Sequence, residues 1–257
     1  IEILGGNDKA AKPEKIRSLE IERGEILAVV GPTGSGKTQL ISDIEQYAQC
    51  DTPSKRQVLI NNIAALNYDN CASIRHLTAE VAQNMNFVID ISVREFLMMH
   101  AEIREIKNPG KIVEKVIAVT NELAGEPISA KDNVTVLSGG QARALMVADV
   151  ALISNAPIVL IDEVENAGIN RMQAMNFLAG QGKVVLVVTH DPMLSLMADR
   201  RIVMKNGGMF KLQKTTPKEK MILRQLINID QQMSFIRDII REGENLDQKI
   251  LLEGVTA

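Results

Sequence analysis

Residues 25–38 read EILAVVGPTGSGKT, and this stretch decides the fold. A run typical of a buried strand leads into a glycine-rich loop, and apolar residues at helical spacing follow over 38–48. The loop fits the pattern GxxxxGK[ST], which places a glycine-rich turn between a strand and a helix. The candidate phosphate-binding residues are Gly31, Pro32, Thr33, Gly34, Ser35, Gly36, Lys37, Thr38 and Gln39.

The chemistry of this loop follows from its residue types. Its glycines let successive backbone N–H groups curl around a phosphate chain, and the helix N-terminus adds partial positive charge. Lys37 is expected to reach the β- and γ-phosphates and to act in catalysis, while the Thr38 hydroxyl is expected to bind Mg²⁺. The alternative is a glycine-rich turn that fits by chance, which the strand–loop–helix context disfavours.

The segments around the loop alternate between short β-rich runs and longer helical ones. Runs typical of strands fall at 57–60, 78–82, 158–161 and 184–188, and helical spacing occurs over 93–101, 112–123 and 141–153. Buried strands separated by helices predict a mostly parallel sheet covered on both faces. Residues 201–204 and 209–212 flank Lys205-Asn-Gly-Gly208, which predicts a hairpin and an antiparallel β edge. The expected fold is therefore an α/β P-loop NTPase core with a mostly parallel sheet and an antiparallel β edge.

Residues 215–257 predict a C-terminal helical extension beyond a nucleotide-binding domain of residues 1–214. Thr216-Pro-Lys-Glu219 supplies an N-cap threonine, a proline at the first helical position and a capping-box glutamate. A helix of about two dozen residues should follow, weakening near Gly243, with a shorter helical segment over 246–252. A heptad seam runs through Ile222, Leu226, Ile229, Met233, Ile236 and Ile240. Burial of this seam on the chain's own core is favoured over contact with a second protomer, and both interpretations stay open.

Composition narrows the class of protein. The 257 residues include 46% hydrophobic and 24% charged residues, with a formal net charge of −3, as in ordinary globular proteins. No apolar run approaches the ~18 residues of a transmembrane helix. Two cysteines, Cys50 and Cys71, exclude a disulfide scaffold and favour a reducing, intracellular setting. The near-neutral charge and the absence of Trp make a nucleic-acid partner unexpected.

Two further strand ends carry polar side chains. Residues 158–163 read IVLIDE, and Asp162 at the end of this strand can hold Mg²⁺ through water. Glu163 should point to the opposite side of the strand and polarise a water for attack on the γ-phosphate. A plain strand end is the alternative, which the upstream phosphate loop disfavours. His190 follows the strand at 184–188, at the edge where parallel sheets bind ligands, and could donate to a γ-phosphate oxygen.

Residues 137–141 read LSGGQ, and together with the motifs above they resemble the ATP-binding cassette (ABC) ATPases. Two glycines that open a helix expose backbone N–H groups and a serine hydroxyl to an anion. The resemblance implies that this anion is the γ-phosphate of ATP held by another protomer, so that two ATP molecules lie within a head-to-tail homodimer. The residues implied in this contact are Ser138, Gly139, Gly140 and Gln141.

The resemblance, which covers most of the chain, also assigns Gln83. The segment 80–87 looks like the family's Q-loop, and the resemblance implies that this loop leads into a helical subdomain over about 84–136. By resemblance Gln83 is catalytic, because it contacts Mg²⁺ or the attacking water. The same loop and the helical subdomain would contact the partner that the ATPase drives, a membrane domain or an assembly protein.

Three departures from the family pattern qualify these expectations. Residues 1–24 contain no aromatic side chain to stack on adenine, so base selectivity should be weak. The segment 166–169 reads NAGI, and the usual aspartate is missing or replaced by a shifted Asn170. Arg143 is the only basic residue between the LSGGQ segment and Arg171. Hydrolysis should survive these changes, while communication between two sites is in doubt.

We therefore expect an ABC-type ATPase with ATP and Mg²⁺ as cofactors. The leading hypothesis is the nucleotide-binding subunit of a membrane transporter, cytoplasmic or attached at the inner face of the membrane. A soluble ABC ATPase in cofactor or metal-centre assembly or genome maintenance is the alternative. A nucleotide-binding regulatory module is a second alternative, which the intact Glu163 disfavours.

Overall fold

The computed structural model describes residues 1–64, 77–162 except 82–86, and 170–246. By contacts the chain forms two compact units, Ile1–Lys214 and Thr215–Ala257. The strands of the first unit are β1 (Glu2–Leu4), β2 (Ser18–Glu20), β3 (Ile26–Val30), β4 (Gln57–Ile60), β5 (Ile63–Ala64), β6 (Thr78–Val81), β7 (Ile158–Asp162), β8 (Val184–Val188), β9 (Arg200–Lys205) and β10 (Gly208–Lys214). Its helices are α1 (Lys37–Glu45), α3 (Val93–Ile103), α4 (Pro109–Leu123), the 3-10 turn η2 (Val134–Val136), α5 (Gly139–Leu152), α6 (Arg171–Gly180) and α7 (Pro192–Met197).

Ten strands form two sheets in the described part of this unit. One is a six-stranded sheet in the order β10-β9-β3-β8-β7-β6, and the other is a four-stranded antiparallel sheet in the order β2-β1-β4-β5. All neighbours in the larger sheet are parallel except the β9–β10 hairpin. The predicted mostly parallel sheet with an antiparallel edge is confirmed.

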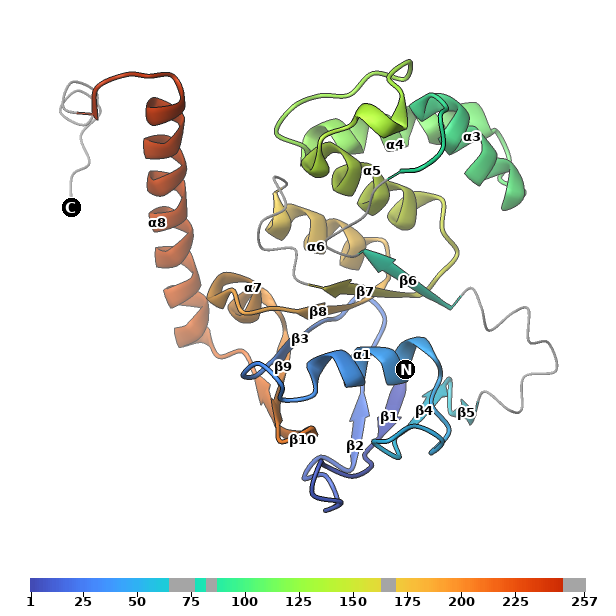
Figure 1. Cartoon of the computed structure of the whole chain (residues 1–257), viewed down its shortest axis with the longest axis vertical. Helices are drawn as coiled ribbons and strands as arrows, with labels where there is room; N and C mark the ends of the chain where they lie inside the picture. Colours follow the sequence, from blue (N-terminus) through green and yellow to red (C-terminus); the bar gives the residue numbers. More distant parts are fainter. Residues whose placement is uncertain (65–76, 82–86, 163–169, 247–257) are drawn as a thin grey trace. The chain divides into compact units, whose positions relative to one another are not determined.

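Alternation along the central strands divides the core into two layers. On β3, Ala28 packs with the helices α3 to α6, whereas Leu27 and Val29 pack with α1 and the small sheet. The strands β7 and β8 alternate in the same way, since successive side chains of a strand point to opposite faces. Figure 1 shows the resulting layers, with α3, α4, α5 and α6 on one face of the larger sheet and α1 on the other.

Several predicted boundaries shift for local reasons. The helix predicted over 38–48 ends at Glu45, because Tyr47 adopts a left-handed backbone with φ of 51°. The helix predicted to start at 112 starts at Pro109, which occupies the first turn, where its missing N–H costs nothing. No clear hydrophobic periodicity marks the short strands β1, β2 and β5 or the helices α6 and α7 in the sequence. The proposed end of the strand at Ala82 lies outside the described residues.

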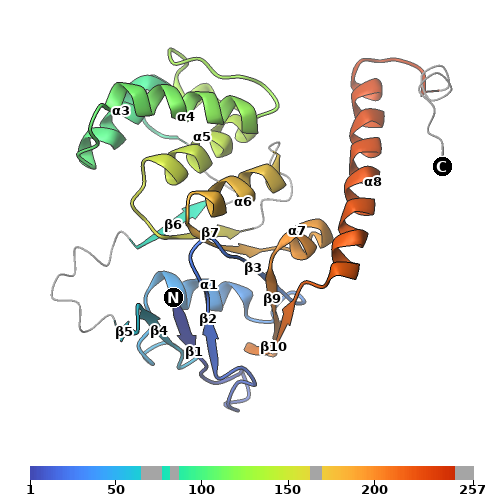
Figure 2. The same cartoon turned by 180° about the vertical axis from the view of Figure 1, so that it is seen from behind.

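The second unit contains α8 (Pro217–Arg241), which begins with the predicted capping box. Thr216 N donates to the Glu219 carboxylate at 2.8 Å, and Glu219 N donates to the Thr216 hydroxyl at 3.2 Å. Along the heptad seam, the side chains of Ile222, Ile229, Met233 and Ile240 are exposed on α8, and what covers the seam stays a prediction. Figure 2 shows α8 as one continuous helix. The shorter segment predicted over 246–252 lies, apart from Leu246, outside the described residues.

Candidate functional site

The phosphate loop connects β3 to α1 through a backbone that requires glycine. Gly36 is the N-cap of α1 and adopts φ of 98°, a left-handed conformation. A Cβ at Gly36 would lie 2.7 Å from the Cα of Gly207 in the β9–β10 turn, and Gly207 N donates to the Ser35 carbonyl at 2.8 Å. The turn therefore supports the loop from behind. Asn206 and Gly207 both have positive φ, as the predicted hairpin turn requires.

Lys37 lies inside the loop that precedes it. The residue is buried, and its Nζ donates to the carbonyl oxygen of Gly31 at 2.9 Å and to that of Pro32 at 3.4 Å. The ammonium group is therefore held at the centre of the loop, where backbone N–H groups converge on a phosphate in this motif.

Strand register brings the polar strand ends to the same edge of the sheet. Asp162 lies beside Val188 across β7 and β8, and Val188 in turn lies beside Val29 across β8 and β3. The carboxyl ends of these three parallel strands therefore meet where β3 enters the phosphate loop. His190 follows β8 by two residues at this edge and is exposed.

A cavity of about 500 Å³ opens at this edge. Its lining residues are Lys9, Thr33, Gly34, Gly36, Lys37, Thr38, Gln39, Asp162, Val188 and His190. The structure thus brings together the predicted loop residues, one predicted Mg²⁺ ligand from β7 and the predicted γ-phosphate donor. A hydroxyl and a carboxylate in one polar cavity are the oxygen ligands that Mg²⁺ prefers.

The turn that carries His190 is held by its neighbours. Asp191 N donates to the Thr189 hydroxyl at 2.9 Å, and the Asp191 carboxylate accepts from Met193 N at 2.7 Å as the cap of α7. Asp191 also forms an ion pair with Arg171 of α6 at 2.7 Å. These bonds fix the backbone on both sides of His190, so its place at the edge of the cavity is determined.

Ser138 begins α5 with a second capping box. Its hydroxyl accepts from Gln141 N at 3.2 Å, and Ser138 N donates to the Gln141 side chain at 2.9 Å. Ser138 and Gly139 are exposed, and residues 138–141 are not among those lining the Lys37 cavity. Within one chain, therefore, the structure does not bring the LSGGQ segment to the phosphate loop.

Some predicted site residues lie outside the described part of the chain. These are Gln83, Glu163 and the segment 166–169. Asn170 is described, and its side chain accepts from Gln173 N at 3.1 Å as the N-cap of α6. This local role accounts for an asparagine at that position.

Glu80 of β6 forms a group of three carboxylates with Glu45 of α1 and Asp162 of β7. Partial desolvation raises the pKa of the Glu80 carboxyl above its ordinary value, although the residue is exposed, and the charges of Glu45 and Asp162 raise it further. Glu80 also lines a separate cavity of about 500 Å³ between β6, α3 and α5, together with His100, Arg104 and Asp149. His100 Nδ1 and the buried Asp149 carboxylate are 3.0 Å apart there.

Lys9 is a cavity residue that no motif indicated. It belongs to the loop between β1 and β2, and its Nζ donates to the carbonyl oxygen of Gly34 at 2.8 Å. A lone lysine in a polar segment carries no spacing pattern, so only the fold could bring it to the phosphate loop.

Comparison with known proteins gives the family. The family described as ABC transporter matches residues 15–166. The uncharacterized ABC transporter ATP-binding protein MJ0121 of Methanocaldococcus jannaschii is 52% identical over 258 residues, which cover 99% of this chain and 98% of that protein. The macrolide export ATP-binding/permease protein MacB of Campylobacter jejuni is 31% identical over 82% of this chain, which spans 35% of MacB.

A solved structure shows the same architecture. The dimeric structure of MJ0796, a bacterial ABC transporter cassette, superposes with a TM-score of 0.63 at 25% identity, covering 84% of this chain and 99% of that one. The family match includes the phosphate loop, the LSGGQ segment and the end of β7. The chain therefore belongs to the ABC transporter family, as an ATP-binding and ATP-hydrolysing member.

Proposed function

We propose that this chain is the nucleotide-binding subunit of a membrane transporter and converts Mg-ATP binding and hydrolysis into closing and opening of a homodimer. The observation that carries the proposal is the cavity that Lys37, Thr38, Asp162 and His190 share. These residues come from three separate strand ends and supply a cation, two oxygen ligands and an imidazole. Phosphoryl transfer needs this combination of positioning and charge neutralisation.

Each side chain has a distinct task in the proposed site. Lys37 holds the β- and γ-phosphates, and Thr38 and Asp162 hold Mg²⁺, with Gln83 as a further ligand. Mg²⁺ bound there would neutralise charge on the phosphate oxygens. Glu163 accepts the proton of the attacking water, and His190 donates a hydrogen bond to the γ-phosphate.

The proposed second half of the site comes from another copy of the chain. The α5 N-terminus is exposed and lies outside the Lys37 cavity, and its capping box uses the N–H groups of Ser138 and Gln141. The N–H groups of Gly139 and Gly140 and the Ser138 hydroxyl hydrogen are therefore the donors proposed for a phosphate held by a second protomer. Bound ATP would then bridge Lys37 of one protomer and residues 138–140 of the other. The solved cassette of MJ0796 is itself described as dimeric, which supports this arrangement.

The proposed transport role rests on relatives and on surface chemistry. MacB is named as an ATP-binding/permease protein, and this chain spans 35% of its length. Among the described residues of this chain, no helix is long and apolar enough to span a membrane. We place the contact with a separate membrane domain on the Gln83 loop and on the helical subdomain, which includes α3 and α4. The chain would act in the cytoplasm, at the inner face of the membrane.

Glu163→Gln tests the proposed site and dimer together. Glutamine is nearly isosteric but cannot accept the proton from water, so turnover should stop while Mg-ATP still binds. Light scattering should then show more dimer with Mg-ATP than with ADP. Ser138→Arg, added to this variant, should abolish the gain, whereas Ser18→Arg on exposed β2 should preserve it. A dimer that forms without nucleotide and ignores Ser138→Arg would contradict the shared site.

Fractionation of the native host tests the transport role. The chain should sediment with membranes together with a membrane-spanning partner and should be released by detergent. Recovery entirely in the soluble fraction, in complex with an assembly protein, would favour the soluble ATPase instead.

A further inference from the structure

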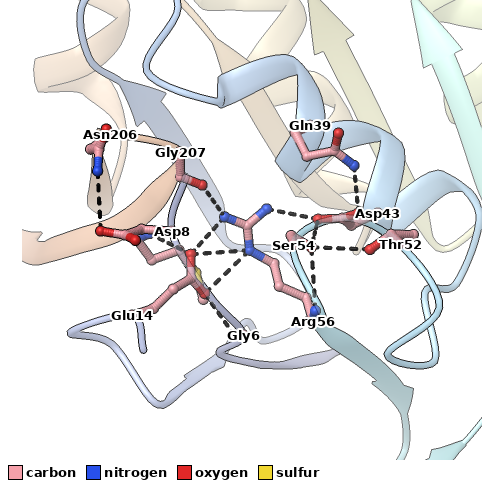
Figure 3. Close-up of polar contacts among 11 residues, drawn as sticks. Gly6, Asp8, Glu14, Gln39, Asp43, Thr52, Ser54, Arg56, Asn206 and Gly207 are labelled. Carbon is pink, nitrogen blue, oxygen red and sulfur yellow. Dashed lines mark hydrogen bonds and ion pairs between the residues drawn. The ribbon is translucent and has the colours of Figure 1, made fainter. Parts of the chain in front are cut away.

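A cluster of three buried charges lies behind the phosphate loop (Figure 3). Arg56 Nη2 lies 2.6 Å from the Glu14 carboxylate and Arg56 Nη1 lies 2.7 Å from the Asp43 carboxylate. All three side chains have no exposed surface. Burying such charges is costly unless each is paired and hydrogen-bonded, so the cluster holds these segments in one arrangement.

Asp43 connects the cluster to the nucleotide cavity. It lies on α1, one turn after Gln39, and its Oδ1 accepts from the Gln39 side chain at 2.8 Å. Its Oδ2 accepts from the Ser54 hydroxyl at 2.7 Å. Gln39 lines the cavity of Lys37, so the orientation of its amide depends on a carboxylate that Arg56 holds.

Glu14 connects the cluster to two loops. Its carboxylate accepts from Gly6 N at 2.9 Å and from Met209 N at 2.6 Å. Arg56 Nη2 also donates to the Gly207 carbonyl at 2.9 Å. The cluster therefore joins both ends of the loop 6–14 to the β9–β10 turn, which supports the phosphate loop.

The loop 6–14 presents Lys9 toward the phosphate loop. Asp8 accepts from Ala10 N at 2.8 Å, from Lys12 N at 2.9 Å and from the Asn206 side chain at 3.2 Å. Lys9 N donates to the Asn206 carbonyl at 2.8 Å, and a Cβ at Gly207 would lie only 2.7 Å from the Lys9 Cγ. The backbone and the stem of Lys9 are therefore fixed, although the residue is exposed.

Lys9 lines two cavities. The first is the cavity of Lys37, and the second has a volume of about 460 Å³. Both are lined by Lys9, Gly36 and Gln39. The remaining lining of the second cavity is Asn7, Asp8, Ala11, Pro53, Ser54, Lys55 and Gly207, which includes no aromatic side chain.

We propose that Lys9 is a second cationic ligand of the nucleotide's phosphate chain, and that the Arg56 cluster positions it. This proposal rests on the proposed nucleotide site and adds a residue from outside its motifs. In the structure Lys9 and Lys37 each donate to a carbonyl of the same loop, at 2.8 and 2.9 Å. A phosphate oxygen is a stronger acceptor than a carbonyl because it is charged, so a bound nucleotide would draw both ammonium groups to its phosphates.

Lys9→Gln tests the contact, with Lys12→Gln as the matched control. Lys12 is exposed on the same loop and lines neither of the two cavities. Calorimetry would measure the affinities of adenosine, ADP and ATP in each variant. We expect Lys9→Gln to weaken ADP and ATP about tenfold and to leave adenosine unchanged, because one charge-assisted bond is lost. The affinity for ADP should also depend less steeply on salt concentration.

Three outcomes would overturn the contact. These are unchanged ADP affinity, an equal loss for adenosine, or an equal loss in Lys12→Gln. Lys37→Ala in the same assay separates the two proposals. If wild type binds ATP and Lys37→Ala does not, the nucleotide site stands. Unchanged ADP and ATP affinities in Lys9→Gln would then refute only the Lys9 contact. If wild type binds no nucleotide, both proposals fail.

Arg56→Lys tests the positioning role, because lysine keeps the charge but cannot bridge two carboxylates with a planar fork. We expect weaker binding of ADP with adenosine unchanged. In this background Lys9→Gln should add little further loss, since the two residues act as one unit. A near-ultraviolet circular dichroism spectrum like that of wild type would show that packing is retained. Two results would refute the positioning role. One is that the losses of ADP affinity in Arg56→Lys and Lys9→Gln add fully in the double variant, and the other is that Arg56→Lys weakens adenosine as much as ADP.

Discussion

Lys37 and Lys9 place the same chemical group on the same loop by two different routes. Lys37 is buried at the first position of α1, six residues after the Gly31 carbonyl that it contacts. Lys9 is exposed and lies 25 residues from its partner Gly34. Local backbone geometry places the first lysine, whereas buried ions from distant segments hold the loop that carries the second. A sequence motif therefore identifies only those residues of a site that lie close together in one segment of the chain.

The largest effect should come from the cluster that holds the Lys9 loop. Arg56→Ala leaves Glu14 and Asp43 buried without their cation, and should lower the free energy of unfolding by about 3–5 kcal/mol. Urea denaturation would measure the loss. Arg200→Ala is the control, because its ion pair with Glu25 is partly exposed and should be worth about 1 kcal/mol or less. Equal losses of unfolding free energy in the two variants would show that the buried Arg56 cluster contributes no more to stability than a partly exposed ion pair.

The next effect separates the two lysines. Lys37→Ala should abolish turnover and weaken ATP binding at least about a hundredfold, near 2.7 kcal/mol, compared with about tenfold for Lys9→Gln. The reason is that Lys37 is desolvated inside the loop, while Lys9 competes with water. Phosphate release and calorimetry would measure both. Near-normal turnover in Lys37→Ala would refute its assignment.

The difference between the affinities for ATP and GTP should be smaller than the loss of ATP affinity in Lys37→Ala. Residues 1–24 contain no aromatic side chain to stack on adenine, so GTP should bind within about tenfold of ATP, or ~1.4 kcal/mol. Competition between the two nucleotides would measure the ratio. A hundredfold preference for ATP would show that a further group recognises adenine.

The smallest effect concerns the negative edge near Asp162. The Glu80 pKa is raised in the fold, so ionised Glu80 costs stability above that pKa, and the cost disappears as pH falls below its ordinary value of 4.5. Glu80→Gln should therefore stabilise the protein by a few tenths of a kcal/mol at pH 7 and have no effect at pH 4. Thermal melts at both pH values would test this, with exposed Glu102→Gln as control. A stabilisation that persists at pH 4 would exclude charge as the cause.

Much of the fold could be predicted from residues 25–38 and from the buried strands. Their fully apolar runs require cover on both faces, and this requirement alone implies a parallel sheet between helices. Strands of three residues, such as β1 and β2, are too short to show a period, so the four-stranded sheet was not predicted. Helix α7 spans six residues and was missed for the same reason.

The residues of the candidate site also fall into those that the sequence predicted and those that it did not. Lys37, Thr38, Asp162 and His190 were predicted because each lies at a strand end or within a contiguous motif, and the structure places all four on one cavity. The roles of Gln83, Glu163 and the LSGGQ segment stay predictions. Nothing in the sequence pointed to Arg56, since a buried arginine between a lysine and a glutamine looks like part of a solvated surface.

The sequence by itself determined the family, the phosphate-loop motif and the edge of the sheet at which we propose that the nucleotide binds. These features depend on residues close together in the chain, or on strand ends that a parallel sheet must align. Only the tertiary structure decided that the loop 6–14, the start of β4 and the β9–β10 turn meet behind the phosphate loop. Arg56, Glu14 and Asp43 are separated by up to 42 residues, and they pair because each charge, once buried, requires an opposite charge within hydrogen-bond distance.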